Sequence, residues 1–591
     1  MLATLLATSS LAVATQAADM NKTLRVVFPT AESGFDPQAN SDLYSADIMR
    51  AIFEPPLRYD YLARPVKFVP NTAEAMPVFS DGGRTVTVKI KPGIFFKDDP
   101  AFGGKKRELV AEDYIFGIKR VWDPKIISPR QSEWSEFEIL GAQEFYEHAK
   151  SKGIDFNKTI EGLRALDRYT IQIKTRLPRP TLIEQLAFNT FTPIAREVYE
   201  KYKDPSNKLE QNPVGTGPYY LKEWKRASKM VLEANPYYRG ITFPTQSDDP
   251  SDQAVIEEMR GKKLPAIGRV IVNVIEESNP RLLAFKGQSL DVLGAVPVDL
   301  VDGVIQGGRL IRELAEQQVK WVRGLQPALS YTYFNMDDPV LGGYTNERIA
   351  LRRAMIMAFN NQDYIKVVFK GHAEAAGQFI PPPNTGHDPS APKGGMPEPA
   401  VARALLDRYG YKDRDGDGYR ENPDGTPLVI TKSSATRELD RQEDEIWKKS
   451  MDAIGIKIQF NKAKWPDLLK EGKAGRLQMW GVGWISALPD GGTFAGLLYS
   501  GRIGQSNYSR FKNKEFDEAF DQAMSMQQSP ERTHLFRKMN DIMSVYGVWE
   551  KGIYRYQNTL LQPWVQGYKK MPFLDNPWWF WDIDASKQVI R

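Results

Sequence analysis

The stretch NPVGTGPYY at residues 212–220 decides the fold, and the stretch LEANPYYRG follows it at residues 232–240. Two glycines and two prolines fall within six residues of the first stretch. This density is typical of a tight turn that leads directly into a strand. Gly215 and Gly217 have neither the G-x-G-x-x-G spacing nor a helix pattern after them, so the turn does not predict a phosphate-binding loop.

Upstream of this turn, apolar and polar residues alternate in two short segments. Val86, Val88 and Ile90 share one face of residues 84–91, and residues 169–174 repeat the pattern. Alternation of this kind is typical of strands with one buried face. We therefore expect an antiparallel sheet in the first third of the chain.

Downstream of the turn, helix patterns alternate with strand patterns. Apolar residues recur at helical spacing in four segments, and apolar strand-like segments follow two of them. The predicted helices are 346–359, 398–409, 440–454 and a segment after Trp465-Pro466, and the predicted strands are 456–460 and 477–482. This order predicts an α/β lobe, in which ligands bind where loops converge at the ends of strands.

Composition excludes several classes of protein. The chain has 591 residues, enough for about four domains' worth of core. It carries 79 Lys and Arg against 74 Asp and Glu, a net charge of +5, so we expect no nucleic-acid partner and no acidic tail. There is no cysteine, which excludes disulfides, Cys-ligated metals, thiol nucleophiles and a lipid anchor on cysteine.

The N-terminus contains the one candidate targeting segment. Residues 1–18 carry no charge, and an apolar run at 2–13 is followed by small residues that offer two small-x-small cleavage sites. We interpret 1–18 as a signal peptide, with a start upstream because the basic region is missing; a buried or frayed helix is the alternative. No later stretch reaches the ~18 apolar residues of a membrane span. We expect export to a bacterial periplasm.

Motifs of known enzymes are missing. The sequence has no G-x-S-x-G elbow, no H-E-x-x-H and no P-loop lysine. No two of its histidines lie at i, i+4, so a helical metal pair is excluded; they are His148, His372, His387 and His534. Paired carboxylates from distant loops, as in glycosidases, stay open. A secreted hydrolase is therefore the distant alternative to a protein that is not an enzyme.

One segment has the spacing of an ion site. Asp413, Asp415 and Asp417 alternate and a glycine stands at the sixth position. Tyr419 at the seventh would offer its carbonyl, and Asp424 falls at the twelfth. Calcium-binding loops have this spacing, although a charged residue at the eighth position departs from an EF-hand. The segment predicts either a structural calcium site or a connector built from Asx-turns.

The two stretches at 212–220 and 232–240 closely resemble the signature of the family 5 solute-binding proteins, the extracellular receptors of peptide and nickel ABC importers. Further segments are similar to that family in the same order. They are residues 33–38, 81–96 followed by 110–114, 333–336 followed by 346–354, and the Gly-Trp region at 480–500. The resemblance covers residues 24–591.

The resemblance implies an α/β fold, the three-domain, type II periplasmic binding protein architecture of the large peptide-binding class, with two lobes and a hinge. Domain I would comprise residues 19–57, 188–330 and 553–591, domain II residues 58–187, and domain III residues 331–552. The hinge would be two chain crossings, near 323–333 and near 553–561. Closure about this hinge would trap the ligand and present a new surface to a membrane permease.

The resemblance also implies a function. The protein would be a periplasmic receptor that captures a peptide-like solute between its lobes and delivers it to the permease subunits of an ABC importer in the inner membrane. A non-peptide solute, such as an oligosaccharide, opine, bile acid or metal chelate, is the alternative. We expect a monomer that requires no cofactor. The expected cleft residues are Ser33, Tyr333, Asn335, Trp484 and Asp490; for Trp484 the alternative is a place in the core.

One position departs from the family's peptide receptors. They carry an aspartate three residues after the Gly-Trp tryptophan, where it pairs with the free amino group of the ligand, and here that position is Ala487. A buried ammonium without a counter-charge costs roughly several kcal/mol. Either Asp490 supplies the carboxylate, or the ligand has no free α-amino group.

Overall fold

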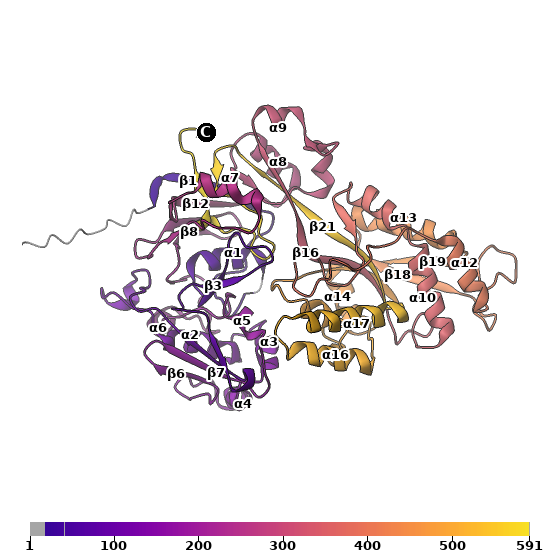
Figure 1. Cartoon of the computed structure of the whole chain (residues 1–591), viewed down its shortest axis with the longest axis horizontal. Helices are drawn as coiled ribbons and strands as arrows, with labels where there is room; N and C mark the ends of the chain where they lie inside the picture. Colours follow the sequence, from indigo (N-terminus) through magenta and orange to yellow (C-terminus); the bar gives the residue numbers. More distant parts are fainter. Residues whose placement is uncertain (1–17, 41, 590–591) are drawn as a thin grey trace, which may run out of the picture.

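The computed structural model describes residues 18–40 and 42–589. Figure 1 shows two bodies, one coloured indigo to magenta on the left and one mainly orange on the right, with the long strands β16 and β21 running between them. Within these residues, three sheets of four or more strands organise the structure. The predicted signal peptide lies outside the described residues, apart from Ala18.

The first sheet follows directly from the turn at 212–220. Its strand order is β1 (Asp19–Phe28), β12 (Ile267–Val274), β9 (Lys229–Ala234) and β8 (Tyr219–Lys225). A Cβ on Gly215 would lie 2.0 Å from the carbonyl oxygen of Ile52, the last residue of α1 (Leu43–Ile52), and a Cβ on Gly217 would lie 2.6 Å from it. The glycines are therefore needed for close approach of two backbones, and the predicted turn into a strand is confirmed.

The second sheet is antiparallel throughout and lies in the first third of the chain, as predicted. Its order is β4 (Val78–Ser80), β5 (Thr85–Lys89), β7 (Thr170–Lys174) and β6 (Leu163–Asp167). The alternating Val86, Val88, Ile171 and Ile173 are all buried in one core. The helices of this region are α2 (Ala111–Lys119), α3 (Gln131–Glu136), α4 (Ala142–Lys152), α5 (Leu182–Gln185) and α6 (Arg196–Tyr202).

The third sheet has seven strands. Along it lie β13 (Val292–Leu293), β21 (Trp549–Leu561), β16 (Lys320–Phe334), β20 (Met479–Ile485), β18 (Val429–Ser434) and β19 (Lys457–Lys462), with β17 (Ala373–Ala375) beside β21. The predicted helices and strands of the α/β lobe are confirmed. The helices are α10 (Asn346–Ala358), α12 (Pro399–Arg408), α13 (Glu438–Asp452), α14 (Trp465–Lys473), α16 (Lys514–Met524) and α17 (Pro530–Tyr546).

Two long antiparallel strands join the bodies. Residues of β16 pair with β21 from Lys320 opposite Leu561 to Tyr333 opposite Trp549. Figure 1 shows both strands leaving the left-hand body beside α8 (Ser278–Lys286) and entering the right-hand one. The predicted chain crossings at 323–333 and 553–561 are thus neighbours in one ladder, whereas the division into three domains stays a prediction.

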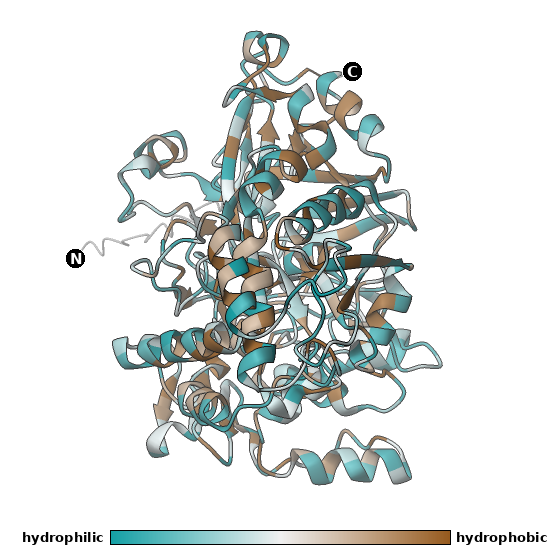
Figure 2. Cartoon of the chain, turned by 90° about the vertical axis from the view of Figure 1, so that its right-hand side faces the viewer, coloured by the Kyte–Doolittle hydropathy of each residue, from teal (hydrophilic) through white to brown (hydrophobic). Residues whose placement is uncertain are grey.

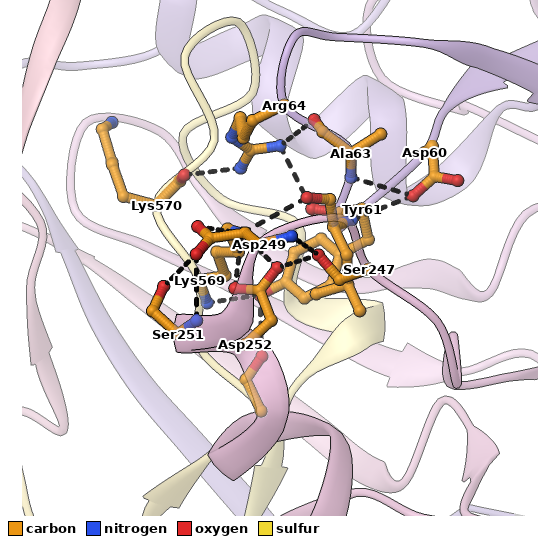
Figure 3. A network of polar contacts seen from close by, with 12 residues as sticks. Asp60, Tyr61, Ala63, Arg64, Ser247, Asp249, Ser251, Asp252, Lys569 and Lys570 are labelled. Atoms are coloured by element: carbon orange, nitrogen blue, oxygen red, sulfur yellow. Dashed lines mark hydrogen bonds and ion pairs between the residues drawn. The ribbon is translucent and has the colours of Figure 1, made fainter.

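The end of the chain returns to the first body. There β22 (Val565–Gln566) pairs with β23 (Asp582–Ile583). Figure 3 shows Lys569 beside Asp249 and Asp252; its Nζ pairs with Asp252 and lies 3.6 Å from Asp249 Oδ2. The hydroxyl of Tyr61 donates to Gly567 O and accepts from Lys569 N, both at 2.7 Å. These contacts fasten the C-terminal segment to residues far upstream.

A buried ion pair fastens the opening segment at 33–38. Arg120 Nη1 donates to Asp36 Oδ1 at 3.0 Å, and both side chains have no exposed surface. Burial alone would raise the pKa of Asp36, but the charge and hydrogen bonds of Arg120 hold it below its ordinary value. The pair joins the first segment of the chain to the end of α2.

Polarity varies around each helix rather than along it. Figure 2 shows teal and brown residues mixed on the helices, as expected where one face packs on a core. Within the described residues, no helix combines the length and the apolar character that crossing a membrane requires.

Candidate functional site

A cavity of about 610 Å³ lies over one face of the seven-stranded sheet. Ligand sites commonly measure roughly 300–1,000 Å³. Strands β16, β20 and β21 form the floor, and the start of α13, the π-helical turn Tyr364–Val368 and residues 295–301 contribute walls. The polar or charged lining residues are Gln326, Ser330, Thr332, His372, Arg437, Asp440, Glu443, Glu550, Arg555, Gln557 and Asn558.

Small residues keep the floor open. Ser330 lies opposite Gly483 and Thr332 lies opposite Gly481 in the antiparallel ladder between β16 and β20. Side chains alternate between the two faces of a strand, so these four residues share the face below the cavity. Gly483 is exposed, and a Cβ there would meet nothing closer than 3.6 Å. The floor is therefore mostly backbone that a ligand can approach closely.

A bulge in β21 brings two charged residues to this floor. Glu550 and Arg555 are five positions apart, which in a regular strand would place them on opposite faces. The register of β21 against β16 shifts next to Gly552, which has φ +57° and packs where a Cβ would lie 2.1 Å from Ser330 O. The irregularity changes the alternation, and both side chains line the cavity.

The acidic residues of the wall already have partners. Asp440 and Glu443 are three residues apart on α13 and so share one helix face. Arg437 Nε lies 2.6 Å from Asp440 Oδ2, and the buried Lys432 Nζ lies 3.1 Å from Glu443 Oε1. Burial alone would lower the pKa of Lys432, but the neighbouring carboxylates raise it. This side of the cavity is held by ion pairs.

Glu550 is the one acid of the floor with a strongly shifted titration. Burial raises its pKa to about 7, although the N–H of Gly552 donates to its carboxylate at 2.8 Å and acts in the opposite sense. The negative charge of Glu443 also contributes to this rise in the pKa of Glu550. Glu550 therefore changes charge near neutral pH.

One edge of β20 beside the cavity has no strand partner. Along Met479–Ile485 the strand pairs with β16, but β18 pairs with it only at Met479 and Trp480. From Gly481 to Ile485, no other strand in the described part of the chain occupies the second edge. Free N–H and C=O groups on such an edge can pair with an extended chain.

The five predicted cleft residues do not line this cavity. Tyr333 and Trp484 lie on the opposite face of the sheet, where they pack against the core under α16 and α17. Their neighbours in sequence, Thr332 and Gly483, face the cavity instead. Two adjacent residues of a strand point to opposite faces, so an error of one residue exchanges cavity for core. A ligand contact by either side chain stays a prediction.

Asn335 and Ser33 also have other surroundings. Asn335 is 3% exposed, and its amide donates to the carbonyls of Gly475 and Leu477 at 2.8 and 3.0 Å. Ser33 is exposed, and its N–H donates to Ser45 Oγ at 2.9 Å. Asn335 thus joins the end of β16 to the segment before β20, Ser33 contacts the start of α1, and neither residue borders the cavity.

Asp490 is buried in an ion pair. Arg532 donates to its two carboxylate oxygens at 2.6 and 2.9 Å, and Gly492 N–H donates at 2.7 Å. Burial and the charge of Asp490 raise the pKa of Glu184, from the second-sheet region, well above its ordinary value. The pairing with Arg532 argues against Asp490 as the anchor for a ligand ammonium, a role that stays a prediction.

The loop at 413–424 brings together four carboxylates, of which three are exposed and one is half-buried. Asp413, Asp415, Asp417 and Glu421 offer oxygens that all lie within 4.8 Å of one another, the only such group within residues 18–40 and 42–589. The predicted ligand Asp424 is outside the group, and its carboxylate accepts from Thr426 N at 3.0 Å. The prediction did not include Glu421. This residue is the ninth of the loop, counted from Asp413, and the ninth position often contributes a ligand in calcium-binding loops.

Sequence reasoning also missed Arg555, Glu443 and Glu550. A signal for the correct face was present in Gly481 and Gly483, since alternating glycines in a strand mark a face where something approaches closely. The bulge at Gly552 left no comparable signal, so the charged residues of β21 could not be assigned to a face.

Comparison with known proteins identifies a family model and relatives that match this chain. The family model "Bacterial extracellular solute-binding proteins, family 5 Middle" matches residues 67–506. Di/tripeptide-binding protein 2 of Pseudomonas aeruginosa is 23% identical over 564 residues, 93% of each chain. Heme-binding protein A of Haemophilus influenzae is 23% identical over 510 residues, 85% of this chain and 82% of that protein.

A solved structure has the same fold. The ABC transporter-associated periplasmic binding protein DppA from Helicobacter pylori, in complex with peptide STSA, superposes with a TM-score of 0.70 at 20% sequence identity. The match covers 95% of this chain and 98% of that one. The predicted type II periplasmic binding protein fold of the large peptide-binding class is confirmed.

Proposed function

Because this chain belongs to the family 5 bacterial extracellular solute-binding proteins, we propose that it is the receptor of an ABC importer and captures short peptides. The family consists of solute-binding receptors and not of enzymes. In this proposal the protein changes no bond in its ligand, and the energy of binding is spent partly on closing the two bodies.

The unpartnered edge of β20 supports a peptide ligand. Its backbone from Gly481 to Ile485 borders the cavity, and the side chains there are small at Gly481 and Gly483. An extended peptide would pair with this edge through its main chain, which every peptide shares, while its side chains enter the cavity. Such a site binds many sequences, as an importer of nutrients requires.

A matched pair of glycine variants tests this placement. Gly483→Leu should place a side chain in the cavity without backbone strain, because the nearest atom to a Cβ is 3.6 Å away. Gly395→Leu is the control, since its Cβ would meet nothing within 4 Å and lies outside the cavity. Native mass spectrometry with mixed di- to tetrapeptides should detect complexes of the wild type and the control, and few of Gly483→Leu.

A non-peptide ligand is the alternative, and the same experiment decides it. Maltotriose and maltohexaose are added to identical samples of the three proteins. Retention of a sugar but no peptide by the wild type would replace the peptide proposal. Equal peptide retention by Gly483→Leu would place the site elsewhere.

Closure about β16 and β21 is part of the proposal. The two strands are the chain crossings between the bodies, so a bend in this one ladder would bring the cavity walls together. Small-angle scattering should show a smaller radius of gyration when a retained peptide is added. An unchanged scattering profile at saturation would contradict the trapping mechanism.

The cellular setting of this receptor is also part of the proposal. We propose export to the periplasm, no lipid anchor, a monomeric state and delivery to permease subunits of the inner membrane. The three predicted domains would then form the lobes that the permease contacts. Light scattering of the purified protein measures the monomer directly, and fractionation of cells that express it locates it; a dimer or a membrane-bound fraction would contradict these assignments.

A structural calcium ion at 413–421 is a separate proposal. Four carboxylates within 4.8 Å repel one another unless a cation lies between them, and oxygen ligands suit calcium. Calcium should raise the melting temperature of the chelated protein by mass action. Asp415→Ala should abolish the rise, and Asp424→Ala should keep it. Identical melting with and without calcium would reduce the loop to a connector.

A further inference from the structure

The two bodies meet at a contact outside the cavity. Figure 1 shows α3 of the first body, on the left, where it approaches α16 and α17 of the second body, on the right. At this contact Arg502 of the second body lies 2.9 Å from Glu136 of α3. Opening of the bodies about β16 and β21 would separate the contact, so its side chains have different surroundings in the open and closed forms.

Glu184 is buried at this contact. It lies on α5, and its neighbours Leu182 and Leu186 pack in the core of the second sheet, so it belongs to the first body. Glu184 is only 7% exposed. Two groups of the second body act on its carboxyl, since the backbone of Asp490 hydrogen-bonds it and the charges of Asp490 and Arg532 lie near it. A carboxyl of one body is therefore covered by the other body.

The cation that faces Glu184 already has partners. Arg532 donates to the two carboxylate oxygens of Asp490 at 2.6 and 2.9 Å. Its Nε donates to Ala523 O at 2.7 Å, and its Nη1 also donates to Gln528 Oε1 at 3.2 Å. Arg532 and Asp490 together carry no net charge, so this pair does not compensate a second carboxylate.

The first body adds a further acid to the contact. The negative charge of Glu133, on α3, also opposes ionisation of Glu184. Gln185 Nε2 donates to Glu133 Oε1 at 2.5 Å, and Arg130 Nη1 lies 3.4 Å from Glu133 Oε2. The charge of Arg130 is thus already used by Glu133.

Tyr59 faces Glu184 as a neutral group. Burial, and to a lesser extent the charge of Glu184, raises the pKa of Tyr59 far above its ordinary value. Arg50, whose charge acts on Tyr59 in the opposite sense, lies 3.0 Å from Asp47 Oδ1. None of these neighbours supplies Glu184 with a counter-charge, and a buried carboxylate in that situation binds a proton instead.

We propose that closure of the two bodies places a proton on Glu184, so that acid conditions favour the closed form and alkaline conditions favour the open form. The inference rests on the closure that the proposed function includes, and it adds a dependence on pH. The proton is taken from the solvent. When the bodies separate, Asp490 moves away and water reaches the carboxyl, which then ionises as an ordinary glutamate does.

The direction of the effect follows from linkage. In the closed form, burial and the charge of Asp490 raise the pKa of Glu184 well above the ordinary value of 4.5. Protonation therefore favours the closed form fully below pH 4.5, and this contribution is lost as pH rises through the raised value. Between these two values the ratio of closed to open molecules should fall by about tenfold per pH unit.

The test measures the distance between the bodies as a function of pH. The chain has no cysteine, so introduced thiols can be labelled selectively. Lys152→Cys on α4 and Lys514→Cys on α16 place one spin label on each body at exposed positions. Pulsed electron paramagnetic resonance is recorded on the full chain at pH 5, 6, 7 and 8, without ligand and with a random tripeptide library. The fraction of short distances should increase as pH falls in at least one of the two series.

Three variants assign the effect to Glu184. Glu184→Gln is neutral at every pH and has nearly the same shape, so it should close as wild type does at pH 5 and should lose the dependence on pH. Glu147→Gln, an exposed glutamate on α4 paired with Lys150, is the control and should keep the wild-type dependence. Glu550→Gln should also keep it, although Glu550 has a pKa of about 7, because that carboxyl lies in the cavity and not at the contact.

The outcomes separate this inference from the proposed closure. Distances that change with the library but not with pH would overturn the proton on Glu184 and leave closure standing. Distances that change with neither would contradict closure, and the inference with it. A dependence on pH that persists in Glu184→Gln would overturn the inference as well, because another group would then carry the proton.

Discussion

On one face of the seven-stranded sheet, Tyr333 and Trp480 pack into a core that α16 and α17 cover. On the other face, Thr332 and Gly481, the preceding residue of β16 and the following residue of β20, line the cavity. The same two strands thus carry stability on one face and the ligand site on the other. The difference lies in side-chain volume, because large apolar groups fill the first face and small groups leave the second open.

This contrast implies that single substitutions should change the stability of the fold without changing ligand binding, or the reverse. Removing volume from the packed face opens a void inside a close-packed core, which is costly. Adding volume to the open face fills a space meant for a ligand and leaves the core unchanged. The predictions below test how far the separation extends.

The largest effect is expected at the centre of the packed face. Trp480 is 1% exposed and its ring lies 5.1 Å from that of Trp465 and 6.0 Å from that of Tyr508. Trp480→Ala should lower the free energy of unfolding by about 3–5 kcal/mol. Gly483→Leu, on the open face, should change it by less than about 1 kcal/mol. Urea unfolding followed by circular dichroism measures the free energy of unfolding of both variants. Similar decreases in the two variants would contradict the difference between the two faces of the sheet.

A comparable effect is expected at Asp490, outside the cavity. Asp490→Ala leaves Arg532 buried without its counter-charge and should cost about 3–5 kcal/mol of unfolding free energy. The double variant Asp490→Leu with Arg532→Met is the control, and it should recover most of that loss because no charge stays behind.

The same residue sharpens the assignment of the site. If Asp490 belongs to the fold alone, a retained peptide and its N-acetylated form should bind wild type with equal affinity in calorimetry. A strong preference for the free amine that disappears in Asp490→Asn would restore Asp490 as an anchor for the ligand.

An intermediate effect depends on pH. The pKa of Glu550 is about 7 in the folded protein against an ordinary value of 4.5, so the folded state holds its proton more tightly than the unfolded state. Its contribution to stability is complete below pH 4.5 and is lost as pH rises through 7, a change of about 3 kcal/mol. Glu550→Gln should remove this part of the pH dependence.

Unfolding by urea at several pH values between 4 and 8 measures the effect of Glu550. Glu443→Gln is not a suitable control, because the buried Lys432 would lose one of its two carboxylate partners. Glu438→Gln, on the outer side of α13, is a suitable control. A slope that is the same in wild type and Glu550→Gln would show that the carboxyl is ionised throughout.

The smallest effect is expected at a surface contact between the bodies. Arg502 Nη2 lies 2.9 Å from Glu136 Oε2, and the glutamate is 55% exposed. Pairs of this kind contribute about 0.2–1 kcal/mol, so Arg502→Gln should weaken ligand affinity less than about fivefold and only at low salt. Arg476→Gln, which breaks a surface pair within one body, should leave affinity unchanged. A larger loss of affinity in Arg502→Gln would show that this ion pair helps to hold the two bodies together around the ligand.

Much of the fold could be predicted because it depends on local patterns. The alternation of Val86 and Val88 predicted β5, and the glycine-rich turn at 212–220 predicted the entry into β8. Helices α10, α12 and α13 followed from apolar spacing. Each of these signals lies within a few residues, where propensity and periodicity act.

The predicted cleft residues differ from the residues that line the cavity, for reasons of geometry. Tyr333 and Trp484 lie in the correct strands, but alternation leaves open which of two adjacent residues faces the ligand. Asp490 was a plausible free carboxylate until Arg532, 42 residues later, was brought against it. The bulge at Gly552 then moved Arg555 to the floor by an irregularity that periodicity does not encode.

The sequence by itself therefore determined the family, the kinds of helix and strand, and the glycines on which the first sheet and the cavity floor depend. The tertiary structure decided which face of β16 and β20 is covered by helices, which carboxylates are occupied by arginines, and which charged side chains line the cavity. The physical reason is the separation in sequence over which each interaction acts. Turn chemistry and periodicity act between neighbours, whereas the burial and pairing of a charge depend on groups that only folding brings together.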